Sequence, residues 1–269
     1  MTKMQSYNAN GWKGFVNTEW IDAFDDLDQW LEQNPGETIV EKPTRTVTRV
    51  AMANSILYVK RVETLAVGDG RFLRNLTRKL RWLLRPSRAI SVMKTTMKML
   101  EAGVPCPTPI LAARKRTPGK MPTDIFITLE AKGDNLKKLL EDTGNDQDKI
   151  ELLVKSAARA VARLHEVGFV HGDCIPGNMI VGNDDQIAFI DNDRTFASSS
   201  HKQQEKNLVQ FAAHLAYETQ SLEILDIFIE VYCQAAQRNQ QDRLLQTIKK
   251  GVGARFDDWT RRKNIVLPQ

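Results

Sequence analysis

Three oxygen-bearing side chains stand close together in the segment 171–194, which reads HGDCIPGNMIVGNDDQIAFIDNDR. Asp173 is followed five residues later by Asn178, and Asp191 follows the second apolar run after that, Ile187–Ile190. Mg²⁺ prefers hard oxygen ligands and commonly bridges a carboxylate to substrate phosphates. A further carboxylate can orient an attacking hydroxyl and accept its proton. The pattern therefore indicates phosphoryl transfer, with Asp173 as the base and Asn178 and Asp191 as metal ligands.

The alternative is that these residues only form turns, as Asp and Asn often do. The elements around them favour the chemical interpretation. Pro176 and Gly177 make the loop Asp173–Asn178 a rigid turn. Met179–Val181 and Ile187–Ile190 are predicted strands joined by a turn over 182–186. We expect this hairpin to bring Asn178 and Asp191 together.

Length and composition favour a globular protein. The 269 residues allow one or two domains, and 42% hydrophobic residues suffice for a core. No apolar run is long enough for a signal peptide or a membrane span, so we expect a cytoplasmic protein. Three cysteines suit neither a zinc site nor a disulfide framework. We expect Cys174, inside the loop, to be a spectator thiol.

The first part of the chain is predicted to hold a helical extension followed by strands. Asn17 or Thr18 can cap a helix that runs to about Gln33. The predicted strands Thr46–Met52 and Ile56–Arg61 follow, and Lys60 lies late in the second one. Lys60 is a candidate phosphate ligand, and the alternative is an ordinary solvated lysine. The strands have no glycine lid, so Lys42, Arg45 and nearby backbone amides would have to cover the phosphates.

A strongly basic segment follows these strands. Residues 60–88 contain nine Lys or Arg and two acidic residues, a net charge of +7, whereas the whole chain has +5. Within residues 71–85, leucines recur at helical spacing among the basic residues, as in a membrane-surface helix. The alternative is a helix packed on the small lobe with a solvated face.

Further helices and one strand are predicted along the rest of the chain. Ser87–Ala102 is a helix whose only acidic residue is Glu101, and the string VPCPTPI after it is extended. Residues 131–134 are a candidate hinge after the strand Asp124–Glu130. In the helix Asp148–Glu166, His165 is expected to be packed and not catalytic. The remaining predicted helices are Lys206–Glu218, Leu222–Gln237 and Arg243–Lys263.

The spacing H-x-D-x-x-x-x-N, followed by an apolar strand ending in Asp, resembles the protein-kinase-like fold. A finer resemblance, to the bacterial lipopolysaccharide kinase family, covers nearly the whole chain. That family phosphorylates Kdo or heptose of the lipid A core. The segments that carry this resemblance are GWKGFV, LYVKR, RPSRA, GVPCPTPI, HGDCIPGN, IDNDR and HKQQEKNLVQFAAHL.

The resemblance implies an α+β, two-lobed protein-kinase-like fold. The lobes would be a small β-rich N-lobe over 38–130 and a larger helical C-lobe over 131–269, after a helical extension over 1–37. ATP and Mg²⁺ are the implied cofactors. Asp173 would be the base, Asn178 and Asp191 would bind metal, and Lys60 would contact ATP phosphates. Backbone groups from Glu130 to Lys132 would bind the adenine edge, and Asp193 and Arg194 match the family's D-x-D-R.

The expected function is therefore an ATP-dependent kinase of a sugar hydroxyl, working at the cytoplasmic face of the inner membrane. The expected partners are a glycolipid or sugar and an anionic membrane surface bound through residues 71–88. No nucleic acid and no obligate protein partner are expected. Gly172 stands where protein kinases usually have Arg, and no A-P-E segment follows Asp191, which disfavours a peptide substrate. The alternatives are a kinase of a small soluble metabolite or aminoglycoside-like acceptor, and a pseudokinase that binds nucleotide without turnover.

Overall fold

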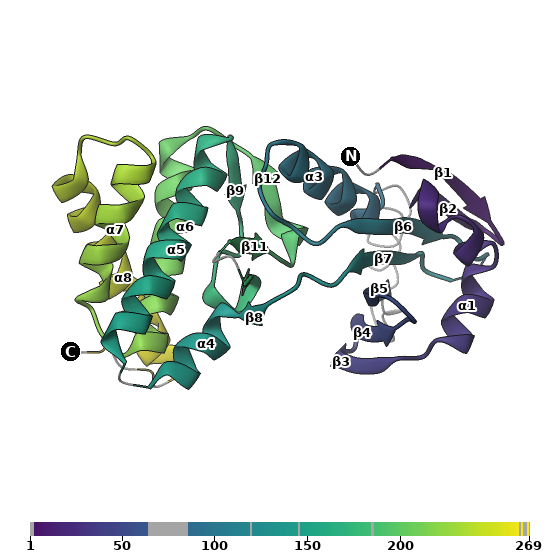
Figure 1. Cartoon of the computed structure of the whole chain (residues 1–269), viewed down its shortest axis with the longest axis horizontal. Helices are drawn as coiled ribbons and strands as arrows, with labels where there is room; N and C mark the ends of the chain where they lie inside the picture. Colours follow the sequence, from purple (N-terminus) through teal and green to yellow (C-terminus); the bar gives the residue numbers. More distant parts are fainter. Residues whose placement is uncertain are drawn as a thin grey trace, which may run out of the picture. The chain divides into compact units, whose positions relative to one another are not determined.

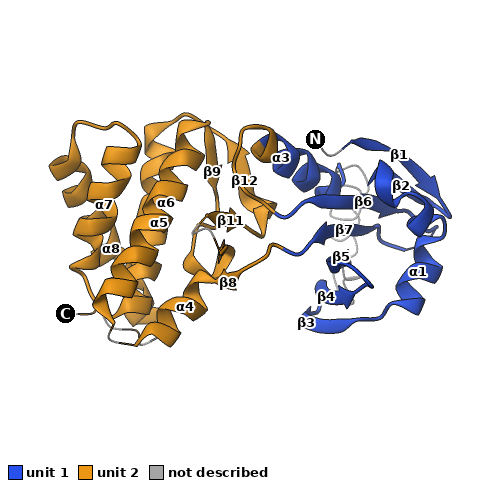
Figure 2. Ribbon diagram, viewed as in Figure 1, with its two compact units in different colours: residues 1–98, 107–130 blue, residues 99–106, 131–269 orange. Residues whose placement is uncertain are grey.

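The computed structural model of the chain describes residues 3–63, 86–118, 120–144, 146–183, 186–263, 265 and 268. The predicted basic helix 71–85 lies outside these residues. The chain forms two compact units (Figure 2). Unit 1 comprises Met1–Lys98 and Pro107–Glu130, and unit 2 comprises Met99–Cys106 and Ala131–Gln269.

Unit 1 is built on a seven-stranded antiparallel sheet with the order β1-β2-β6-β7-β5-β4-β3 (Figure 1). Its strands are β1 Met4–Ala9, β2 Trp12–Asn17, β3 Glu37–Lys42, β4 Arg45–Ala51, β5 Ile56–Glu63, β6 Pro109–Lys115 and β7 Thr123–Leu129. Successive side chains of a strand face opposite sides of a sheet. One side carries a core that includes Leu57 and Val59, and it is covered by α1 (Leu27–Gln33). On the other side Phe126 packs with Ala89 and Met93 of α3 (Arg88–Glu101).

A buried ion pair fixes the start of α3 on the sheet. Asp124 of β7 accepts hydrogen bonds from the Arg114 guanidinium, at 2.8 and 2.7 Å, and from the Ser87 hydroxyl at 2.7 Å. The backbone N–H of Arg88 donates to the same carboxylate, and Ser87 caps the helix by accepting from the N–H of Ile90. A carboxylate at a helix N-terminus is favourable because the helix dipole is positive there.

The predicted helical extension over 1–37 is wrong. Its first half forms β1 and β2, which pair with each other, and β2 also pairs with β6. Two 3-10 turns, η1 Thr18–Trp20 and η2 Asp22–Phe24, replace most of the predicted helix, and α1 begins only at Leu27 with Asp26 as its cap. The aromatic residues that suggested one long helical face are divided among these short elements, and Phe24 and Trp30 still reach the same core.

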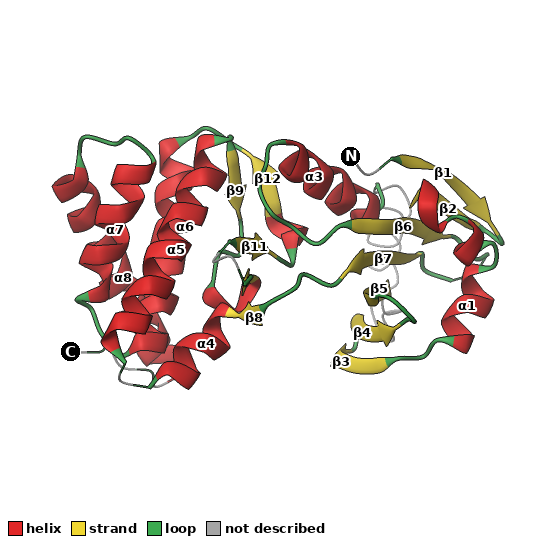
Figure 3. Ribbon diagram, in the orientation of Figure 1, coloured by secondary structure: helices red, strands yellow, loops and turns green. Residues whose placement is uncertain are grey.

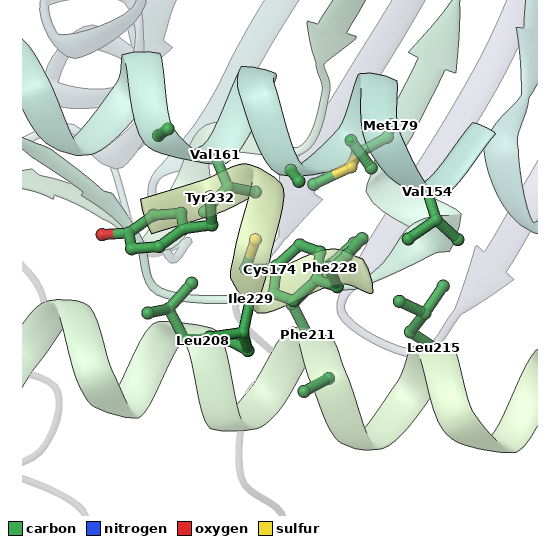
Figure 4. Packing of buried hydrophobic residues seen from close by; sticks show 14 of the residues in the cluster. Val154, Val161, Cys174, Met179, Leu208, Phe211, Leu215, Phe228, Ile229 and Tyr232 are labelled. Atoms are coloured by element: carbon green, nitrogen blue, oxygen red, sulfur yellow. The ribbon is translucent and has the colours of Figure 1, made fainter. Parts of the chain in front are cut away.

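Unit 2 is mainly helical (Figure 3). Its helices are α4 Leu136–Thr143, α5 Gln147–Glu166, α6 His201–Thr219, α7 Ile224–Ala235 and α8 Gln241–Lys263. Two small sheets accompany them, β8 Asp134–Asn135 with β10 Met179–Val181 and β11 Ile187–Phe189, and β9 Phe169–His171 with β12 Thr195–Ala197. Val154, Phe211 and Phe228, from α5, α6 and α7, meet in the core (Figure 4).

The fold class is confirmed as α+β, with a β-rich N-terminal part and a helical C-terminal part. The two compact units divide between Glu130 and Ala131, but 1–37 belongs to unit 1 and 99–106 to unit 2. In the described part of the chain, no helix combines the length and the apolar character needed to cross a bilayer.

Candidate active site

The three residues of unit 2 that were predicted to act as base and metal ligands lie on consecutive short elements. Asp173 follows β9, Asn178 ends the 3-10 turn η3 (Pro176–Asn178), and Asp191 follows β11. β10 pairs with β11 as an antiparallel hairpin, with Met179 opposite Phe189. The hairpin brings the two loops together, because the N–H of Ile190 donates to the carbonyl of Asn178 at 3.0 Å.

His171 ties the loop after β9 to the end of the hairpin. Its ring is fully buried, and its Nε2 lies 3.0 Å from the Ile190 carbonyl oxygen. Since a carbonyl can only accept, Nε2 carries the proton and Nδ1 accepts from the N–H of Asp173 at 3.3 Å. Burial lowers the pKa of His171 and favours the neutral ring that these two bonds require. His171 thus fixes the backbone of Asp173 next to the residue that precedes Asp191.

Asn178 is oriented by its side-chain amide. Its Nδ2 donates to the backbone carbonyl of Asp173 at 2.8 Å. The amide oxygen Oδ1 is then the group that can act as a metal ligand. Asp191 adopts a left-handed backbone conformation, with φ 54° and ψ 48°. That conformation is costly for a residue with a Cβ and is typical of functional sites.

The donor set fits a Mg²⁺ ion that is bound together with a nucleotide. No cluster of three or more His, Cys, Asp or Glu side chains suited to a metal occurs among the residues with described coordinates. Mg²⁺ does not require such a cluster, since it keeps several waters and takes one or two carboxylates plus phosphate oxygens. The Oδ1 of Asn178 and the carboxylate of Asp191 supply hard oxygens of that kind.

Gln210 of α6 holds the carboxylate of Asp173. Its Nε2 donates to Asp173 Oδ1 at 2.9 Å. Sequence reasoning missed this residue, although a signal was present. Asn207 and Gln210 lie three residues apart in the predicted helix Lys206–Glu218, so their amides share one side of it.

The same side of α6 also holds the loop that carries Asp173 through hydrogen bonds. Asn207 donates to the His171 carbonyl and accepts from His165 Nε2 at 2.9 Å, while His165 Nδ1 accepts from the Tyr232 hydroxyl at 2.9 Å. Burial lowers the pKa of His165 to about 4. His165 is therefore the packed, neutral helix-end residue that was predicted. Cys174 is also buried, among α6 and α7 side chains, and burial raises its thiol pKa, which agrees with a spectator role.

Gly172 lies where no side chain fits. A Cβ at this position would lie 2.4 Å from the backbone carbonyl oxygen of Arg194. The contact arises because β9 and β12 pair, with His171 opposite Thr195. A protein-kinase-like Arg is thus sterically excluded here. Asp193 and Arg194 lie on the 3-10 turn η4 (Asn192–Arg194), and Arg194 is exposed.

The remaining residues that were predicted to bind ATP lie on unit 1 or in the connection from unit 1 to unit 2. Lys60 is central in β5, opposite Val47 and Phe126, and therefore on the sheet side that packs against α3. Glu101, the only acidic residue of α3, lies exposed at its last residue. Lys42 and Arg45 face each other across the β3–β4 turn.

Glu130 and Lys132 flank the point where the two units divide. The backbone N–H of Glu130 donates to the Ile56 carbonyl at 2.9 Å. Of the two backbone groups of Glu130, only the carbonyl therefore remains to bind a ligand. Its side chain pairs with Arg49 at 3.3 Å and accepts from the Tyr58 hydroxyl.

Comparisons with known proteins agree with the family resemblance. The model of the lipopolysaccharide kinase (Kdo/WaaP) family matches residues 36–232. Mitogen-activated protein kinase 12 of mouse, human and rat is 29% identical over 69 residues, which is 26% of this chain and 19% of each relative. A solved structure, WaaP in complex with acyl carrier protein, has a TM-score of 0.60 at 16% identity, over 85% of this chain and 92% of that one. The last comparison shows the fold alone.

Proposed function

Because the chain belongs to the lipopolysaccharide kinase (Kdo/WaaP) family, we propose that it transfers the γ-phosphate of ATP to a sugar hydroxyl of lipopolysaccharide core, on Kdo or heptose. One observation carries the proposal. His171 and Asn178 hold Asp173 and the residue before Asp191 in one hydrogen-bonded unit. This arrangement suits a base placed beside a metal–phosphate site.

In the proposed reaction Asp173 orients the acceptor hydroxyl through one carboxylate oxygen while Gln210 holds the other. The acceptor oxygen forms a bond to the γ-phosphorus, the bond from that phosphorus to the β–γ bridging oxygen breaks, and the hydroxyl proton passes to Asp173. The products are a sugar phosphate and ADP. Asp173 then returns its proton to solvent.

The remaining ligand roles follow from residue chemistry and family resemblance. Asn178 Oδ1 and the Asp191 carboxylate would hold Mg²⁺, which neutralises charge on the β- and γ-phosphates when bound. Lys60 would contact the phosphates as a point charge. The carbonyl of Glu130 and the backbone of Lys132 would bind the adenine edge. All of these roles apply to the protein with nucleotide bound.

The alternatives differ from this proposal in what the protein does with ATP. A pseudokinase would bind nucleotide without transferring phosphate. The hydrogen bonds that position the base and the metal ligands would then serve no reaction. A kinase of a soluble metabolite or aminoglycoside would ignore core sugars. The proposed place of action is the cytoplasmic face of the inner membrane, where the glycolipid acceptor would be presented.

Labelled ATP and purified protein, incubated with core oligosaccharides of defined structure, test the proposal. We expect label on a Kdo- or heptose-bearing acceptor, dependent on both Mg²⁺ and acceptor. Label released only as free phosphate, or placed only on aminoglycosides or small metabolites, would contradict it. Size-exclusion chromatography of the active fraction checks the prediction that no obligate protein partner is needed.

A further inference from the structure

Arg255 of α8 is a cation with an unsatisfied buried donor, and the charges of Asp173 and Asp258 act on it. Its Nε is buried and has no hydrogen-bond partner among the residues that the structure describes. A buried donor left without a partner costs about 1–3 kcal/mol, so such groups are rare unless a ligand satisfies them. Burial lowers the pKa of Arg255, while the charge of Asp173 acts in the opposite direction. Asp173 acts here through its charge and not as an acceptor for Nε.

α6 packs against α8 beside Gln210 and one turn before Arg255. A Cβ on Gly251 would lie 2.6 Å from Val209 Cγ2, so the two helices approach closely at this point. Arg255 lies one turn after Gly251, and Gln210 directly follows Val209. Because Gln210 bonds to Asp173, the two helices and the loop converge on one region of unit 2.

An aromatic cluster borders the guanidinium. The Cζ of Arg255 lies 5.7 Å from the ring centre of Trp259, which contacts the rings of His214 at 4.9 Å and Tyr217 at 6.2 Å. These three rings are only partly buried. The guanidinium thus lies over an aromatic ring, and its N–H groups have the geometry for a planar, bidentate acceptor.

We propose that Arg255 binds a carboxylate of the acceptor and so selects an acidic sugar for phosphorylation at Asp173. This inference rests on the proposed function and adds the residue that determines specificity. A carboxylate matches the guanidinium fork in a bidentate way. A phosphate carries more negative charge and would be repelled more strongly by the carboxylate of Asp173. The partly buried rings of Trp259 and Tyr217 would contact the apolar face of the same sugar.

Three soluble acceptors test the assignment. They are a Kdo-bearing core oligosaccharide, the same compound with its carboxyl reduced to an alcohol, and a heptose acceptor that carries phosphate but no carboxylate. For the parent we expect KM to rise about 10- to 100-fold when the carboxylate is removed, the usual range for losing a charge-assisted hydrogen bond. For Arg255→Gln, the acidic and reduced acceptors should have similar KM values, because the residue that distinguishes them is gone.

Arg261→Gln is the matched control, since Arg261 lies on the same helix and is exposed, with its Nη2 3.9 Å from Asp258 Oδ1. It should keep the parent's preference, and thermal unfolding should show all proteins folded. Equilibrium binding of Kdo methyl ketoside without ATP gives a readout independent of turnover, and Arg255→Gln should bind it about 10-fold or more weakly. Three results would overturn the inference while leaving the kinase proposal standing. The parent protein would show no preference for the acceptor with the carboxylate, it would prefer the acceptor with phosphate, or Arg255→Gln would keep the parent's preference. A parent that phosphorylates none of the acceptors overturns both.

Discussion

At the scale of single residues, two uncharged side chains hold the candidate base, Asp173, in position. The carboxylate of Asp173 accepts a hydrogen bond from the Gln210 amide, and the backbone N–H of Asp173 donates one to the neutral ring of His171. These two hydrogen bonds fix the geometry that a general base requires.

The sequence was sufficient to predict Asp173, Asn178 and Asp191 as neighbours, because loop chemistry and a short hairpin are local features. Gln210 and Arg255 could not be predicted with a role. Their proximity to Asp173 depends on how α6 and α8 pack, and helix packing joins residues far apart in the chain. A polar residue on a helix therefore shows its function only when its tertiary neighbours are known.

Removing a metal ligand should change the Mg²⁺ dependence of the reaction. We expect Asn178→Ala and Asp191→Ala to require more Mg²⁺ for half-maximal rate, because each loses an oxygen ligand beside the phosphates. Titration of rate against Mg²⁺, at fixed ATP, measures this. Asn183→Ala, at the far turn of the hairpin, is the control. If both ligand variants keep the parent's rate and titration curve, the metal binds elsewhere.

His165 should make stability depend on pH. Its pKa is lowered to about 4 in the folded protein from an ordinary 6.5, so between these values the unfolded chain binds the proton that the folded chain excludes. The free energy of unfolding should therefore fall as pH decreases from about 6.5 toward 4, by up to roughly 3 kcal/mol. Burial lowers the pKa of His171 too, which acts in the same direction.

Urea unfolding at several pH values measures the effect. His165→Gln should be less stable at pH 7.5, because its bonds to Tyr232 and Asn207 are lost or distorted, but it should show a flatter pH dependence. His201→Gln, at an exposed position, should behave like the parent. An unchanged pH slope in His165→Gln would show that the ring is not held neutral.

At the scale of elements, close backbone contacts position the loop. Gly172→Ala would place a methyl group 2.4 Å from the Arg194 carbonyl oxygen, so β9 and the turn η4 must separate. We expect a loss of about 1–3 kcal/mol in the free energy of unfolding and a large loss of activity. Gly177→Ala is the matched control, since its Cβ would meet no atom closer than 3.9 Å. Equal stability of the two variants, measured by thermal unfolding, would contradict the steric argument.

Elements whose pattern is local were predicted well. The strands around Lys60, the hairpin after Asn178 and the five longest helices among the described residues agree with the structure within a few residues, except at the start of α6. The strands β1, β2, β3, β6, β8, β9 and β12 and the helix α4 were missed. β1 and β2 form because Tyr7, Trp12 and Val16 complete the core of unit 1, and that core is made by pairing β2 with β6 about 100 residues later. Such non-local pairing leaves little trace in a short window of sequence.

At the scale of the whole molecule, the family and the fold class were predictable because the matching segments are spread along the chain. The role of the basic segment 71–88 stays a prediction, since most of it lies outside the described residues. Each Lys or Arg near an anionic surface can add about 1 kcal/mol of binding, screened over about 8 Å at physiological salt. We therefore propose that this segment holds the enzyme on the membrane that presents its acceptor.

Co-sedimentation with vesicles that contain anionic lipid tests this proposal. A variant with four Gln replacements in the segment should no longer bind, while its activity on a soluble core sugar persists. The replaced residues are Arg74, Arg78, Lys79 and Arg81. A control variant removes the same charge from exposed positions of unit 2, namely Lys149, Arg163, Arg261 and Arg262. Parent binding should weaken as salt rises. Equal binding by both variants would mean that the segment is not the membrane contact.

The central claim is that Asp173 is the base for transfer to a sugar hydroxyl, and one comparison tests it directly. Asn at this position keeps an oxygen to accept from Gln210 but cannot take up the hydroxyl proton. We predict that Asp173→Asn transfers label from ATP to a core oligosaccharide about 10²- to 10⁴-fold more slowly than the parent, while equilibrium dialysis shows nearly unchanged ATP binding. A folded, ATP-binding Asp173→Asn protein that keeps transfer within about threefold of the parent, well short of that range, would contradict the claim.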